Sequence, residues 1–156
     1  MIEIKVRGLP APQGSKRHVG KGRMVESSKA VGPWREAVRA ETAAAMRDPY
    51  AAVGILDAAI PPLEGAVTVS ILFTFFRPIS HYGTGRNADT LRKSAPAFPA
   101  NKKNDLDKLV RAVLDGLTMG GAWHDDGQVV TLSAAKRYGV VPGCMIRLDR
   151  MKGEQG

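Results

Sequence analysis

The feature that most restricts the fold is a run of ten residues at 67–76, VTVSILFTFF, made almost entirely of β-branched, aliphatic and aromatic side chains. Such a run predicts a β-strand, and its nearly continuous apolar character is typical of a strand covered on both faces. A membrane-spanning helix needs about 20 consecutive apolar residues, so this run, the longest in the chain, is too short to cross a bilayer. We therefore expect a globular fold built around a buried strand.

An amphipathic helix is expected after this strand. From Leu106 to Leu117 the apolar residues recur at offsets of 3, 4, 7, 8 and 11, which places them on one stripe of a helix over 105–117. Asn104 or Asp105 can cap this helix.

A second helix is predicted from about Lys29 or Pro33 to Arg47, with Ser27 or Ser28 as its cap. Alternating or β-branched segments bounded by glycine and proline predict the remaining strands. These segments and the connections between them are 2–7 (strand), 8–22 (loop or twisted ribbon), 48–64 (connection), 128–138 (strand), 139–143 (turn) and 145–151 (strand). The sum is one α/β (α+β) domain over residues 1–156, with a mixed sheet of about four strands packed by two main helices.

Charge restricts the partners rather than the fold. Lys and Arg number 23 against 15 Asp and Glu, which gives a net charge of +8. A balance this basic indicates nucleic acid, an acidic membrane surface or an acidic protein as partner. The segment 77–104 has six basic residues and one acid, Asp89, and is either a solvated, flexible loop or an arm that contacts phosphates. The basic residues do not form one face of an amphipathic helix, which disfavours the membrane surface.

The compartment is indicated by cysteine usage. The one cysteine, Cys144, cannot form an internal disulfide, which fits a reducing compartment. It lies in an apolar, strand-like segment, so we expect a buried thiol. Residues 1–6 alternate polar and apolar, unlike the apolar stretch of a signal peptide. Together these observations predict a cytoplasmic protein.

Aspartates gather in one part of the chain. Residues at i and i+2 do not share a helix face, so Asp105 and Asp107 can converge only if Asp105 keeps an extended or capping conformation. A hairpin or helix–strand return could bring Asp125 and Asp126 beside them. Carboxylates about 4 Å apart repel by roughly 4 kcal/mol near a surface, so such a cluster needs a proton or a cation, and oxygen ligands suit Mg²⁺. The five aspartates within the 22 residues from 105 to 126 are Asp105, Asp107, Asp115, Asp125 and Asp126.

Each of the four acids in these two pairs also has a purely structural interpretation. Asp105 can serve as the helix cap. Asp107 can interact favourably with the positive end of the helix dipole or pair with Arg111 at i+4. Asp125 and Asp126 can be ordinary turn residues.

Basic side chains share the predicted helix with the acids. Lys108 and Arg111 lie three residues apart on its polar side. They are either solvated or placed to stabilise the charge that develops in phosphodiester hydrolysis. Asp115 is expected to pair with them and so to have a structural role.

Other chemistries find little support in the sequence. His18, His81 and His124 are scattered and lack the spacing of a zinc site. The segment 83–85 (GTG) lacks the lysine of a P-loop and the third glycine of a dinucleotide fingerprint, and no G-x-S-x-G is present. We therefore expect no nucleotide cofactor.

Two segments together resemble a known family. DLDKLVRAVLDGL at 105–117 and DDGQVV at 125–130, followed by Lys136, are similar to the two-part acidic motif of the RusA family of Holliday junction resolvases. Residues 102–138 match closely, and the front of the chain, with PQGSKR at 12–17, resembles the phage and prophage branch. A two-part motif with this spacing is far more specific than a D-x-D tripeptide.

The resemblance implies a homodimeric, cytoplasmic endonuclease of a bacterium or phage. It implies that Mg²⁺, or alternatively Mn²⁺, supports symmetric nicking of four-way DNA junctions in recombination and repair. Carried over position by position, Asp105, Asp107 and Asp126 would be the essential acids, with Asp125 beside them as a further metal ligand.

The family's basic position in the helix aligns with Arg111, where the best-known members carry lysine. Arginine binds phosphate in a fork but cannot donate a proton near neutral pH, so Arg111 would act as an electrostatic stabiliser. Alternatively Lys108 takes part of that role. The candidate DNA-binding residues are Lys16, Arg17, Arg86, Arg92, Lys93, Lys102, Lys103 and Lys136.

Two other functions stay open. A non-catalytic, basic nucleic-acid-binding protein would bind in a salt-sensitive way and show no Mg²⁺ dependence. A metal-dependent nuclease for other branched or single-stranded DNA would use the same acids, so only a comparison of substrates separates it from a resolvase.

Overall fold

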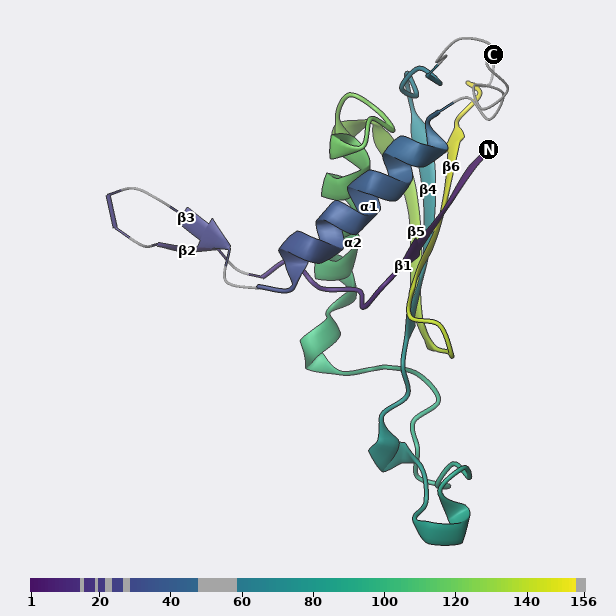
Figure 1. The fold of residues 1–156 in the computed structure, drawn as a ribbon. Coiled ribbons are helices and arrows are strands. Elements are labelled where there is room, and N and C mark those ends of the chain that lie inside the picture. The colour runs from purple at the N-terminus through teal and green to yellow at the C-terminus, as the bar shows by residue number, and fades with distance from the viewer. Residues whose placement is uncertain (15, 19, 22–23, 27–28, 48–58, 154–156) are drawn as a thin grey trace.

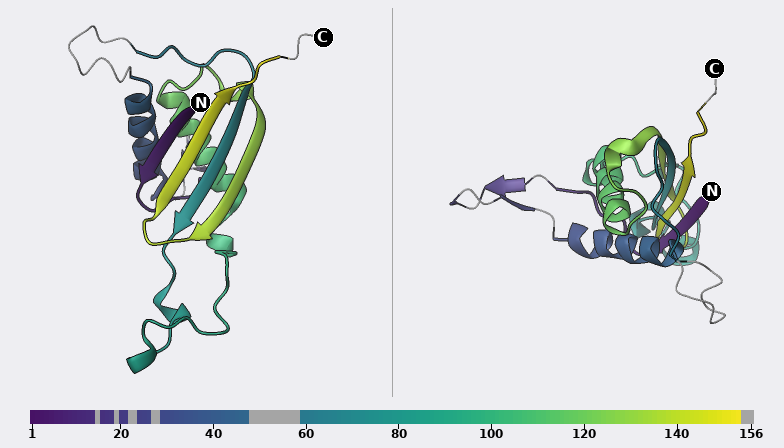
Figure 2. Two further views of the ribbon diagram at one scale, coloured as in Figure 1. Left: turned by 90° about the vertical axis from the view of Figure 1, so that its right-hand side faces the viewer. Right: turned by 90° about the horizontal axis from the view of Figure 1, so that it is seen from above.

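The fold has two layers, a four-stranded sheet and a pair of helices on one of its faces (Figures 1 and 2). The computed structural model describes residues 1–14, 16–18, 20–21, 24–26, 29–47 and 59–153. The sheet has the strand order β1 (Ile2–Arg7), β6 (Gly143–Arg150), β4 (Val67–Phe75), β5 (Val129–Tyr138), and the helices are α1 (Val31–Ala45) and α2 (Leu106–Met119). The predicted mixed sheet of about four strands with two main helices is confirmed.

The front of the chain forms a short ribbon and then α1. Strands β2 (Lys16–His18) and β3 (Met24–Glu26) pair antiparallel, so a ribbon begins within the segment predicted as a loop or twisted ribbon, and its second strand lies just beyond that segment. The N-cap of α1 is Ala30, without a side-chain cap, so the predicted serine cap is wrong. Residues 27–28 themselves, and most of the predicted connection at 48–64, lie outside the described residues.

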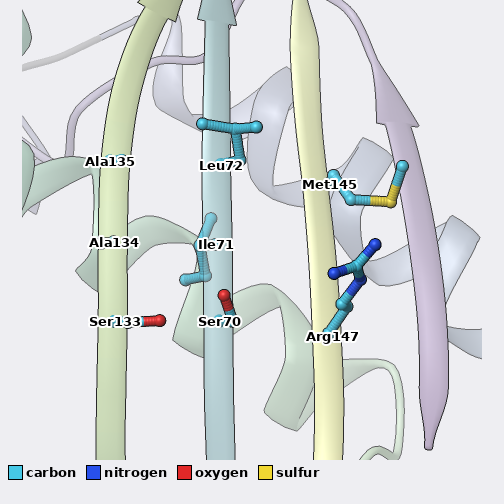
Figure 3. Close-up of a pocket in the computed structure, with 8 residues that line it drawn as sticks. All are labelled: Ser70, Ile71, Leu72, Ser133, Ala134, Ala135, Met145 and Arg147. Atoms are coloured by element: carbon cyan, nitrogen blue, oxygen red, sulfur yellow. The ribbon is translucent and has the colours of Figure 1, made fainter.

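Strand β4 is buried on one face only. Val67, Val69, Ile71, Phe73 and Phe75 face the helices, each no more than 7% exposed. On the other face no described element covers the sheet, and Figure 3 shows a shallow hollow there; its lining residues are Ser70, Ile71, Leu72, Ser133, Ala134, Ala135, Met145 and Arg147. The prediction of a strand covered on both faces is therefore wrong, because threonine, serine and leucine alternate with the apolar positions along one face.

The order of elements fixes the direction of α2. Strands β4 and β5 are parallel neighbours, with Val67 opposite Val129 and Phe75 opposite Tyr138. Helix α2 connects them and runs back against both strands (Figure 1). The start of α2 therefore lies at the carboxyl ends of β4 and β5, which is where open α/β sheets place their sites.

Close packing of the two helices holds α2 in place. A Cβ atom at Gly116 would lie 2.7 Å from the Cβ of Val38, and one at Gly120 would lie 2.5 Å from the Cβ of Thr42. The absence of a side chain at both glycines thus lets the backbone of α2 lie directly against α1. On the side of α2 that faces the sheet, Leu109, Val113 and Leu117 are fully buried.

Residues 77–104 form an arm that extends beyond the carboxyl ends of the strands (Figure 1). Three short 3₁₀ turns lie in it, η2 (Ile79–His81), η3 (Gly85–Asn87) and η4 (Lys102–Asn104). At its base the Arg77 guanidinium lies 4.3 Å from the centroid of the Tyr138 ring and donates to Pro96 O at 2.7 Å. The flexibility expected for this segment stays a prediction.

No helix in the described ranges is both long enough and apolar enough to cross a membrane.

Candidate active site

The start of α2 presents a carboxylate that does not cap the helix amides. Asp105 is the N-cap residue, with φ −58° and ψ 126°, but its side chain accepts no hydrogen bond from the helix amides. Its Oδ2 instead lies 3.3 Å from Nζ of Lys108, and both side chains are about two-fifths exposed, at 43% and 42%. The extended backbone of Asp105 meets the condition under which it can converge with Asp107. The alternative of a capping carboxylate is wrong.

The exposed side of α2 continues from this point. Asp107 lies in the first turn and Arg111 lies one turn further on, and both are exposed. Neither forms an ion pair or a side-chain hydrogen bond with another described residue, so the alternative Asp107–Arg111 pair is not formed. Asp115 likewise makes no pair with Arg111 or Lys108 among the described residues, which contradicts the structural role expected for it. Asp107 and Arg111 are therefore both available to a ligand.

The end of β5 is bonded to the start of α2. Lys136, half-buried on β5, donates from Nζ to Asn104 O at 2.8 Å. The backbone amide of Gln13 donates to Lys108 O at 3.1 Å, and Asn101 Oδ1 accepts from the Asn104 amide at 3.1 Å. Two segments distant in sequence and one local hydrogen bond thus hold Asn104 and Lys108, between which Asp105 lies.

The second acidic pair begins the short turn η5 (Asp126–Gln128). Asp125 Oδ1 accepts from the Gly127 amide at 2.6 Å, so this carboxylate serves as a turn cap, as one interpretation of the sequence held. Asp126 is exposed and makes no side-chain interaction with another described residue. Of the pair, Asp126 has the free carboxylate.

Gln128 fixes the position of this turn, a role that sequence reasoning missed. Its Oε1 accepts from the amides of His124 and Asp125, at 3.0 and 3.2 Å. Its Nε2 donates to Leu63 O at 2.9 Å and to Gly65 O at 3.0 Å, just before β4. The glutamine within DDGQVV was the only signal for it, and its partners, more than 60 residues away, could not be inferred from the motif.

The two acidic pairs lie at opposite ends of α2. Gln128 is hydrogen-bonded to Leu63, just before the start of β4, whereas Asn104 is hydrogen-bonded to Lys136, near the end of β5. Residues 129–136 of an extended strand span about 23 Å, and the 14 residues of α2 span about 21 Å. No group of three or more His, Cys, Asp or Glu in the described part of the chain is placed to hold a metal ion. The expectation that Asp125 and Asp126 meet Asp105 and Asp107 is therefore wrong within one chain. The reason is that a crossover helix returns the chain to the opposite end of the strands.

The start of α2 nevertheless fits a hard cation. Mg²⁺ keeps several waters and is usually held by one or two carboxylates together with substrate phosphate. Asp105 and Asp107 provide two exposed carboxylates at a helix N-terminus, with Lys108 beside them. These are the residues that would hold the ion, with the substrate completing its coordination.

The predicted DNA-binding residues are distributed over the β2–β3 ribbon, the arm and β5. Lys16 and Arg17 lie in β2, and Arg86 lies in η3. Arg92 is exposed but donates from Nε to Tyr82 O at 2.7 Å, so it also shapes the arm. Lys93 is exposed on the arm, Lys102 and Lys103 are exposed in η4, directly before Asp105, and Lys136 lies beside Asn104. The η4 lysines and Lys136 thus gather a positive charge at the start of α2.

Cys144 takes no part in this site. It is 6% exposed on β6, as expected for a buried thiol, and burial raises its pKa to about 12. A thiol with such a pKa is no nucleophile at neutral pH.

These features define a class of protein. A basic α+β fold with two carboxylates at the start of α2 and a basic arm beside them has the features expected of a nuclease, because such a site is suited to metal-assisted cleavage of a nucleic-acid backbone. The family model for endodeoxyribonuclease RusA matches residues 7–149. The chain therefore belongs to the RusA family of endodeoxyribonucleases, as the resemblance of its acidic motif predicted. A comparison with curated proteins finds no match.

Proposed function

We propose that this protein is a Mg²⁺-dependent endonuclease that resolves four-way DNA junctions by paired, symmetric nicks. The observation that carries the proposal is the carboxylate of Asp105, which sits at the N-cap of α2 without capping it. A cap residue whose carboxylate makes no hydrogen bond to the helix amides, beside a free acid, Asp107, is better explained by a ligand than by helix stability.

Each residue at the start of α2 has a proposed role. Asp105 and Asp107 hold Mg²⁺, which when bound supplies an activated water and neutralises charge on the scissile phosphate. Arg111, one turn away and without a partner among the described residues, binds a non-bridging phosphate oxygen and stabilises the charge that develops there. Lys108 offsets the charge of Asp105, which its ammonium contacts at 3.3 Å.

The basic arm supplies affinity for the substrate. Residues 77–104 carry six basic side chains and one acid and extend beyond the sheet at the end where Asp105 lies. Contacts between these side chains and phosphates would release counterions, so binding would weaken steeply with salt. A cytoplasmic, homodimeric resolvase in recombination and repair fits these features, because two sites related by a two-fold axis cut two opposed strands.

The test is incubation of the purified protein with a synthetic four-way junction, with and without Mg²⁺. A linear duplex and the Asp107→Asn variant are the controls. We expect paired nicks near the junction point that require Mg²⁺ and are absent from both controls, with junction binding retained by the variant. Binding without cleavage, with Mg²⁺ or Mn²⁺ alike, would favour a non-catalytic DNA-binding protein. Equal cleavage of flap or single-stranded substrates would favour a nuclease of broader specificity.

A further inference from the structure

The arm leaves the sheet and returns to it beside the same strand, β5. It begins after β4, at Arg77, and ends at Asn104, directly before Asp105 (Figure 1). Its first end contacts Tyr138 of β5, and its last residue contacts Lys136. We propose that Lys136 and Tyr138 are positioning residues, which hold the two ends of the arm on β5 and so align bound DNA with the carboxylates at the start of α2. The inference rests on the proposed function, in which the arm binds DNA.

Strand β5 presents both side chains on the face of the sheet that carries the helices. Lys136 lies opposite Phe73 of β4, and Tyr138 lies opposite Phe75. Both phenylalanines are buried, and residues two apart in a strand point to the same side. Lys136 and Tyr138 are themselves half-buried, and the Tyr138 ring packs against the hydrophobic core. The two side chains therefore extend from a rigid part of the fold.

Tyr138 holds the first end of the arm. The Arg77 guanidinium lies over its ring, 4.3 Å from the centroid, and the His81 ring meets it edge-on, with the centroids 5.6 Å apart. Both are favourable arrangements around an aromatic ring. Arg77 also donates to Pro96 O at 2.7 Å, and the Arg92 amide donates to His81 O at 2.9 Å. The contact with Tyr138 thus extends to the part of the arm that returns to the sheet.

Lys136 holds the last residue of the arm. Its Nζ donates to Asn104 O at 2.8 Å, and within the described ranges it forms no ion pair with an acid. A hydrogen bond from a charged donor is about twice as strong as a neutral one. Because the peptide unit is planar, fixing the Asn104 oxygen also fixes the amide nitrogen of Asp105. Lys136 thereby supports the backbone conformation in which Asp105 does not cap the helix amides.

These contacts matter because the arm and the carboxylates must act on the same strand of DNA. A displacement of about 1 Å at a reacting group can lower a rate about 100-fold. Lys136 acts on the rate through Asp105, whereas Tyr138 acts on binding through the arm. A lysine that bound phosphate directly would behave differently. Its removal would weaken junction binding and lower the slope of log binding constant against log salt by about 0.9, with the rate at saturation unchanged.

Kinetics of three variants separate these roles for Lys136. Lys136→Met keeps the aliphatic part of the side chain and removes the ammonium. We expect its nicking rate at saturating junction to fall about tenfold or more, with unchanged junction affinity and salt slope. Lys136→Arg, which still donates a hydrogen bond, should recover most of the rate. Lys103→Met, at an exposed position in η4, should instead weaken binding and lower the salt slope by up to about 0.9.

Two outcomes would overturn the role of Lys136. One is a Lys136→Met protein that binds like Lys103→Met and nicks at the wild-type rate at saturation. The other is a Lys136→Arg protein that nicks no faster than Lys136→Met.

Tyr138 has its own matched pair of variants. Tyr138→Leu keeps an apolar side chain against the core but removes the aromatic face, whereas Tyr138→Phe keeps the ring. We expect Tyr138→Leu to bind the junction about fivefold more weakly and Tyr138→Phe to bind like the wild-type protein, because a cation over an aromatic ring is stabilised by the ring itself. Equal binding by the two variants would overturn the role of Tyr138.

Amide hydrogen exchange of the DNA-free protein tests the inference without cleavage. Lys136→Met should speed exchange of the Gln13 and Leu109 amides, which donate to Lys108 O and Asp105 O, about fivefold or more. Tyr138→Leu should do the same for the Arg92 amide, while the amides of β4 stay protected in both variants. Unchanged exchange at these three amides would overturn the inference. A wild-type protein that cuts no junction would contradict the proposed function, and the exchange result would still decide the inference.

Discussion

The contact between α1 and α2 gives a prediction whose sign is informative. In a helix interior, replacing glycine by alanine is expected to stabilise by about 1 kcal/mol from propensity alone. At Gly116, however, a Cβ atom would lie 2.7 Å from both Cβ and Cγ1 of Val38 and 3.1 Å from the carbonyl oxygen of Arg35. Overpacking of this kind costs about 1–3 kcal/mol, and a backbone oxygen cannot rotate away. We therefore expect Gly116→Ala to destabilise by about 1 kcal/mol net, against the propensity trend.

Urea unfolding at one fixed protein concentration measures the effect, because the stability of an oligomer depends on concentration. Gly32→Ala is the matched control, since Gly32 also lies in a helix, α1, but a Cβ atom there meets nothing within 4 Å. The control should be neutral or more stable by up to about 1 kcal/mol. A Gly116→Ala protein as stable as the control would show that the helices can separate without cost and would refute the proposed packing.

Three further predictions concern the site and its surroundings. Gln128→Ala removes the four hydrogen bonds that the Gln128 side chain makes around η5 and should lower the nicking rate about tenfold or more with little change in junction affinity, whereas equal nicking would show that Asp126 needs no such support. Burial raises the pKa of Cys144 from 9.0 to about 12, so the folded state keeps a proton that the unfolded chain loses above pH 9. Between pH 9 and 12 the free energy of unfolding should therefore fall by up to about 1.4 kcal/mol per pH unit. The Cys144→Ala variant should lack this component of the pH dependence. The double variant Lys102→Ala/Lys103→Ala should reduce the slope of log binding constant against log salt by up to about 1.8, and an unchanged slope would exclude phosphate contacts by η4.

Local pattern was enough to predict most elements. The apolar stripe from Leu106 to Leu117 marks α2 within two residues of its observed end, because one buried face suffices to define a helix. The single-sided burial of β4 was also present in the sequence, as the alternation of Thr68, Ser70 and Leu72 with larger apolar residues. The continuous apolar character of the run concealed it.

The arrangement of the acids could not be obtained from spacing alone. Asp125 follows Asp107 by only 18 positions, which suggests proximity, but residues 108–119 of the intervening chain belong to α2, a rigid helix that carries the chain away from its starting point. The parallel pairing of β4 with β5 then fixes the two pairs at opposite ends of the sheet. Contacts such as that between Gln128 and Leu63 depend on this topology and have no local signature.

The central claim, paired symmetric cleavage, is tested most directly on a supercoiled plasmid with an inverted repeat extruded as a cruciform. Two opposed cuts made within the lifetime of one complex convert the plasmid to a linear form, whereas a single cut releases the supercoiling, reabsorbs the cruciform and leaves a nicked circle. In the presence of Mg²⁺ we expect linear product as the main species from the wild-type protein, and none from Asp107→Asn. Nicked circles as the main product, or no cleavage under conditions where the protein binds the cruciform, would contradict the account.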